Sequence, residues 1–196
     1  MKLLSVIITS IALASTTIAA PGGWTQWQGG AGGGKSGNNN NGNNNCLSQN
    51  DANDIVNKFI SVLNHPDINA SNATAQALIA DGFFEKSDSI NMLAGHPAGS
   101  ESFKGKAQYI QGVLLAPSIT GINTNMVLPA GCDKVVWHWT FTGIGTRQLP
   151  VNGINIFEIT AKKQIADMYV EFDNIAWGID TGITVYSRNG TKLPLA

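Results

Sequence analysis

Apolar side chains recur at helical spacing in the first half of the chain. Ser48 stands three residues before Asp51, the spacing of a capping box, and apolar residues then follow every three or four positions until His65-Pro66. We therefore predict a helix here, with one buried face. Shorter helices are predicted for 73–84 and 102–116, because each run is followed by a break in the helical pattern. The turn-rich segment between them, 87–100, is predicted to be a loop.

After Pro117 the apolar period falls to about two, which is typical of half-buried strands. In the strand predicted within DKVVWHWTFTG (133–143), Trp137, Trp139 and Phe141 share one side and His138 faces the other. The same alternation predicts a hairpin from 151–160 and 164–173, followed by a short turn or helix at 174–177. Helices followed by a strand meander predict an α+β fold, with N-terminal helices packed on the concave face of a curved antiparallel sheet.

The two ends of the chain differ from this pattern. Residues 1–19 have a charged start, an apolar run too short to span a bilayer, and small residues before Ala20, as in a secretory signal peptide. Residues 20–45 are rich in Gly and Asn and are predicted to form a disordered linker. The remainder fits one domain, 46–181, with a tail at 182–196. We expect a secreted, extracellular protein that does not reside in a membrane.

Cysteine and asparagine motifs agree with export. Cys46 and Cys132 are the two cysteines of the chain, and pairing is the usual state of two cysteines in an exported protein. Glycosylation sequons occur at Asn69, Asn72 and Asn189. The sequence therefore predicts a disulfide and a glycoprotein.

Charge and motif content exclude several functions. The chain has 12 Lys and Arg against 13 Asp and Glu, with no basic cluster, so nucleic acid and anionic membrane are not expected partners. Phosphate-binding loops, serine nucleophile elbows and metal-spaced His or Cys clusters are absent from the sequence. We expect no cofactor and no metal.

The order of elements, the domain length, and the segments LPVNGINIFEI and IADMYVEFDNIAW resemble the nuclear transport factor 2-like superfamily. This cone-shaped α+β fold is shared with ketosteroid isomerases, scytalone dehydratase and SnoaL-like polyketide cyclases, and the chain most resembles small secreted fungal proteins of undefined function. The resemblance spans about 46–180. It implies that any catalysis uses an acid, a base and a phenol or histidine inside an apolar cone, without a cofactor. No catalytic residue of those enzymes can be matched to a position of this chain.

Three acids are candidate catalytic residues: Glu171, Asp173 and Glu158. For each the alternative is structural, as an exposed acid on a strand or, for Asp173, as a helix cap. Candidate ligand-binding side chains are the aromatic and aliphatic residues expected to line the cone, namely Phe59, Tyr109, Trp137, Trp139, Phe141, Ile156 and Trp177. Ordinary core packing is the alternative for these residues.

These features favour a secreted binding domain for a small apolar ligand or a partner protein. The alternative is a cofactor-independent isomerase, cyclase or dehydratase acting on a small aromatic or polyketide-like compound. A third interpretation is a structural homodimer that associates through the sheet, a mode of association that the resemblance implies.

Overall fold

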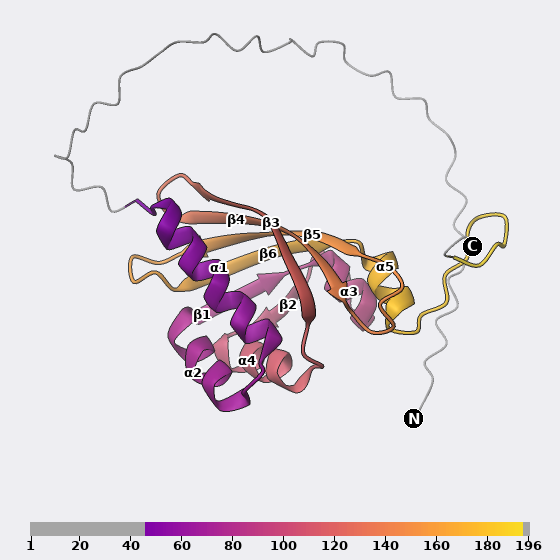
Figure 1. The fold of residues 1–196 in the computed structure, drawn as a ribbon, viewed down its shortest axis with the longest axis horizontal. Helices are drawn as coiled ribbons and strands as arrows, with labels where there is room; N and C mark the ends of the chain where they lie inside the picture. Colours follow the sequence, from indigo (N-terminus) through magenta and orange to yellow (C-terminus); the bar gives the residue numbers. More distant parts are fainter. Residues whose placement is uncertain (1–45, 194–196) are drawn as a thin grey trace, which may run out of the picture. The chain divides into compact units, whose positions relative to one another are not determined.

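A computed structural model describes residues 46–193, which form five helices and one open six-stranded sheet (Figure 1). In chain order the elements are α1 (Gln49–Asn64), α2 (Ile68–Leu78), β1 (Ile79–Lys86), α3 (Asp88–Ala94), β2 (Glu101–Lys104), α4 (Lys106–Leu115), β3 (Thr120–Ala130), β4 (Lys134–Gly143), β5 (Val151–Ile159), β6 (Ile165–Phe172) and α5 (Asn174–Asp180). The predicted α+β class is confirmed. The signal peptide and linker predicted for 1–45 lie outside the described residues.

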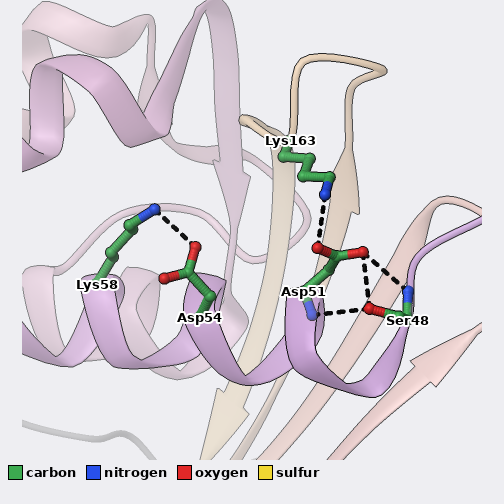
Figure 2. Close-up of polar contacts among 5 residues, drawn as sticks. All are labelled: Ser48, Asp51, Asp54, Lys58 and Lys163. Carbon is green, nitrogen blue, oxygen red and sulfur yellow. Dashed lines mark hydrogen bonds and ion pairs between the residues drawn. The ribbon is translucent and has the colours of Figure 1, made fainter.

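Helix α1 begins where the capping box predicts. The Ser48 hydroxyl accepts from the Asp51 N–H, and the Asp51 carboxylate accepts from the Ser48 N–H in return, so two amides at the start of the helix are satisfied. The same carboxylate pairs with Lys163 from the turn between β5 and β6 (Figure 2). One side chain therefore fixes both the start of α1 and its position against the sheet.

The prediction for 73–84 is wrong at both ends, because α2 begins at Ile68 and ends at Leu78, and 79–84 belong to β1. The prediction for 102–116 is wrong at its start, because α4 begins at Lys106, after the short strand β2. In β1 the neighbouring residues Phe83 and Phe84 point to opposite faces of the sheet: Phe83 is buried, and Phe84 contacts Tyr169. Two adjacent apolar residues are compatible with a strand as well as with a helix.

The segment predicted as a loop, 87–100, contains α3. Its Ser87 cap accepts from the Ile90 N–H, and Gly95 ends it in the left-handed conformation. The helix has only seven residues, too few for an apolar period to stand out in the sequence.

The sheet order is β2-β1-β6-β5-β4-β3, and each neighbouring pair is antiparallel except β1 and β6, which run parallel. Helices α1, α2 and α4 lie together over one part of the sheet, while α3 and α5 pack together elsewhere (Figure 1). The apolar inner face of the sheet and the helices enclose the core. The predicted alternation in β4 is confirmed, because Trp137, Trp139 and Phe141 are buried and His138 is exposed.

Beyond α5 the chain forms no further strand up to residue 193 of the described part, only a bridge between Tyr186 and Lys192. Within 46–193, none of the helices combines the length and the apolar character needed to cross a bilayer.

Candidate functional site

The most unusual side chain of the core is Glu85 of β1. Strand alternation turns Phe83 and Glu85 inward, and the carboxyl-bearing residue is only 1% exposed. Its register partners are Phe103 on β2 and Met168 on β6. None of the five ion pairs found within 46–193 includes Glu85. An acid therefore lies in apolar surroundings without a counter-ion.

Helix α4 brings the Tyr109 phenol into the same region. Tyr109 is 2% exposed, and its ring centroid lies 4.7 Å from that of Phe83 and 5.6 Å from that of Phe103. Gly112, one turn further along α4, leaves room for the Phe103 ring, since a Cβ there would lie 2.6 Å from Cε1 of that ring. The glycine thus allows α4 to approach closely enough for Tyr109 to be enclosed.

Burial changes the acid–base properties of both groups. Loss of hydration raises the pKa of Glu85 from 4.5 to about 8. Loss of hydration also raises the pKa of Tyr109 well above its ordinary value, with a further contribution from charge on Glu85. At neutral pH both groups are therefore protonated, and both are hydrogen-bond donors.

A third polar group of the inner face is the Asn155 amide. Asn155 Oδ1 accepts from Trp139 Nε1 at 2.6 Å, and Asn155 Nδ2 donates to Met168 Sδ at 3.0 Å. Met168 is also the register partner of Glu85, so the amide and the acid lie on either side of one methionine. Asn155 orients the Trp139 indole inside the core.

The three acids predicted from the sequence lie elsewhere. Glu171 accepts hydrogen bonds from Asp88 N and Ser89 N at 2.7 and 3.0 Å, and also from Ser89 Oγ, so it anchors the start of α3. Asp173 caps α5 through the Ala176 N–H at 2.9 Å. Glu158 pairs with Lys134 at 2.6 Å on the outer face. Each of these carboxylates has a structural partner, and the three do not form one cluster.

The predicted ligand-binding residues divide into two groups. Phe59, Tyr109, Trp137, Trp139 and Phe141 are all buried in one aromatic cluster. Trp177 contacts Phe141 and Phe172 from α5, at centroid distances of 6.5 and 4.9 Å. Ile156 instead points to the outer face and is 38% exposed. Six of the seven thus lie on the core side of the sheet.

The predicted disulfide joins Cys46 to Cys132 and ties the segment just before α1 to the turn between β3 and β4. The sequons at Asn69 and Asn72 lie on exposed positions of α2, and Asn189 lies in an exposed turn after α5.

Sequence reasoning missed Glu85 because the preceding residues, 73–84, were predicted to be a helix, and Glu85 itself was placed in no element. In a strand, the alternation of Phe83 and Glu85 against Phe84 and Lys86 would have placed the acid on the side of a buried aromatic ring. That alternation is the signal that could have found it.

The chain is similar to known proteins in its sequence pattern and in its fold. The sequence model of a family described as NTF2-like domain matches residues 45–184. No curated protein matches the chain.

Three solved structures illustrate the similarity. IdmH, a candidate polyketide cyclase from Streptomyces antibioticus, has a TM-score of 0.51 and 16% identity, over 67% of this chain and 99% of that one. A SnoaL-like protein of unknown function from Burkholderia thailandensis has a TM-score of 0.49 and 22% identity, over 65% and 98%. A steroid delta-isomerase from Pseudomonas aeruginosa has 0.48 and 13%, over 70% and 93%. At 16% identity the similarity to IdmH shows a shared fold alone.

Proposed function

The chain belongs to the NTF2-like domain family, and we propose that this member binds a small, largely apolar carbonyl compound inside the cone, against Glu85 and Tyr109. The observation that carries the proposal is a carboxyl and a phenol that are both buried, and near enough for charge on Glu85 to raise the pKa of Tyr109. Keeping an acid in apolar surroundings destabilises a fold at neutral pH, and such groups cluster at functional sites.

The chemistry of the pair indicates the kind of ligand. A protonated carboxyl and a phenol both donate hydrogen bonds, so together they suit an acceptor oxygen such as that of a ketone or ester. The surrounding rings of Phe59, Phe83 and Phe103 suit a flat, apolar body. Of these rings, Phe103 is only partly buried and comes from the four-residue edge strand β2, and entry of a ligand would require this strand to move.

Binding of matched probes to the full chain tests the proposal. We expect 2-acetylnaphthalene to quench tryptophan fluorescence and to bind about tenfold more tightly than 2-ethylnaphthalene, which lacks the oxygen. Tyr109→Phe and Glu85→Leu should each reduce that preference, whereas Tyr186→Phe, at an exposed position, should not. Equal binding of the two probes by the wild-type chain, or no binding of either, would contradict the proposal.

The alternative function is proton transfer at the same site. It is favoured by one observation, the pKa of about 8 for Glu85, because near that pH both forms of the carboxyl are populated, and the ionised form can accept an α-proton that the protonated form returns. Exchange of the α-protons of 2-acetylnaphthalene for deuterium, followed by NMR, distinguishes catalysis from binding. If Glu85 transfers protons, Glu85→Gln abolishes exchange but retains binding; exchange no faster than in buffer leaves binding as the function.

Export is part of the proposal. A disulfide between distant cysteines is typical of oxidising compartments, and the three sequons lie at exposed positions. Protein recovered from the culture medium should begin at Ala20 and should decrease in mass after glycosidase treatment. Retention of Met1 in the cell-associated protein would contradict export.

A further inference from the structure

A second candidate site lies on the opposite, outer face of the sheet. Ile154 and Ile156 of β5 and Tyr169 of β6 are 40%, 38% and 38% exposed on this face. Ile156 is the register partner of both Val136 and Tyr169, so the apolar side chains form a continuous row across three strands. Large apolar side chains gathered in this way on an exposed face are typical of binding surfaces.

The row ends in a hollow of about 280 Å³ beside the start of α3. Ile154, Ile156 and Tyr169 form its apolar part. The remaining lining comes from the end of β1, the start of α3, the loop before β2, and β6, namely Lys86, Ser87, Asp88, Gly99, Ser100, Val170 and Glu171. A hollow of this volume is large enough to hold a single-ring molecule such as benzoate.

The charged side chains around this hollow differ in whether they already take part in hydrogen bonds. Both oxygens of Glu171 accept hydrogen bonds from the first residues of α3, and Asp88 Oδ1 accepts from Gly99 N at 2.6 Å. None of Glu171, Asp88 and Lys86 belongs to the five ion pairs within 46–193, and the Lys86 Nζ lies 5.8 Å from the centroid of the Phe84 ring. The Lys86 ammonium is thus the charged group of the lining that makes no hydrogen bond to any of the described residues, whereas both carboxylates already accept hydrogen bonds.

We propose that this hollow binds a small organic carboxylate, with its apolar body on Ile154, Ile156 and Tyr169 and its carboxylate paired with Lys86. The site is separate from Glu85, because successive residues of β1 point to opposite faces of the sheet. A ligand here would bind whether or not the cone is occupied.

Titration of the full chain with benzoate, followed by NMR, tests this proposal, with benzyl alcohol and benzylamine as neutral and cationic probes. We expect benzoate to bind most tightly and to perturb the amides of Ile156 and Tyr169. Lys86→Gln should weaken benzoate about fivefold, the size expected of an exposed ion pair, and leave benzyl alcohol unchanged. The control Lys104→Gln removes an exposed cation of β2 and should change neither. Ile156→Ala should weaken both benzoate and benzyl alcohol.

Three results would overturn the proposal: benzoate binding unaffected by Lys86→Gln, benzylamine binding as tightly as benzoate, or no binding of any probe. Sedimentation velocity tests the competing explanation, in which the apolar row is a contact between two copies of the chain. A dimer that dissociates in Ile156→Glu, with no benzoate bound by either form, would make the hollow part of an interface between copies. Glu85→Gln should leave benzoate binding unchanged, so failure here is distinguishable from failure of the cone site.

Discussion

Lys163 Nζ lies 2.6 Å from Asp51 Oδ1, and this ion pair joins the first turn of α1 to a turn 112 residues later in the chain. The other carboxylate oxygen accepts from Ser48 N and Ser48 Oγ, as Figure 2 shows. The local cap and the long-range contact therefore depend on the same ionised group.

The first prediction concerns the pH dependence of this contact. The hydrogen bond from Lys163, followed by those from Ser48, lowers the pKa of Asp51 from 3.8 to about 2. Because the pKa is lowered on folding, the stabilisation is fully present above pH 3.8 and is lost as the pH falls through about 2. Asp51→Asn should lower the melting temperature at pH 7, and the difference from wild type should shrink between pH 4 and pH 2.

Asp54→Asn is the matched control, since Asp54 forms only an exposed pair with Lys58 within the same helix. An effect of Asp51→Asn no larger than that of Asp54→Asn would contradict the prediction.

The second prediction concerns Glu85. Its pKa rises on folding, so the folded chain binds more protons than the unfolded chain between pH 4.5 and about 8. The free energy of unfolding of the wild type should therefore fall across this range, by on the order of 4 kcal/mol. Glu85→Gln removes this dependence. Denaturant midpoints of the wild type and Glu85→Gln should be measured at intervals from pH 4.5 to 8. The two midpoints should be similar at low pH, and that of Glu85→Gln should be higher at high pH.

Glu158→Gln provides the comparison for a carboxyl on the outer face, and its midpoints should follow those of the wild type across this range. Parallel pH profiles for wild type and Glu85→Gln would show that Glu85 does not titrate as its burial predicts.

The third prediction concerns the space beside Trp139. A Cβ at Gly153 would lie 2.3 Å from Trp139 Cζ2 and 2.8 Å from Phe172 Cβ, so the indole would have to move within a packed core. Gly153→Ala should destabilise the fold by about 1–3 kcal/mol, as overpacking does. Gly82→Ala in β1 is the control, because nothing lies within 4 Å of its Cβ position. Equal urea midpoints for the two variants would contradict the close packing.

The fourth prediction concerns the bond between Cys46 and Cys132. It closes a loop with a sequence separation of 86 residues, so its removal in Cys46→Ser/Cys132→Ser should cost about 4 kcal/mol in the chain-entropy model. Reducing agent should lower the melting temperature of the wild type and leave the double variant unchanged. If the reductant shifts both proteins equally, the effect does not come from this bond.

Where local chemistry decides the structure, the sequence was sufficient. The spacing of Ser48 and Asp51 predicts the start of α1 because a capping box involves residues three apart. The alternation of Trp137 and Trp139 with His138 predicts which face of β4 is buried, because side chains in a strand alternate regardless of the partner strand.

Where pairing between distant strands decides the structure, the sequence was not sufficient. Residues 79–84 become a strand because β6, more than 80 residues later, pairs with them, and no local pattern contains that information. The position of Glu85 follows from the same pairing. Glu171 was predicted as a polar position because its strand was recognised in the sequence. Its hydrogen bonds to α3 were not predicted, because the sequence pattern did not reveal that helix.

The parallel pairing of β1 with β6 also has a consequence for biosynthesis. Ile79 and Ile165 are register partners, so the ribosome must add about 86 further residues before the partner of β1 exists. During that interval the nascent chain holds an apolar strand with an open edge, and such intermediates are prone to aggregation. Non-local contacts of this kind also slow folding. Folding of this domain should therefore reach completion only after the C-terminal hairpin has left the exit tunnel.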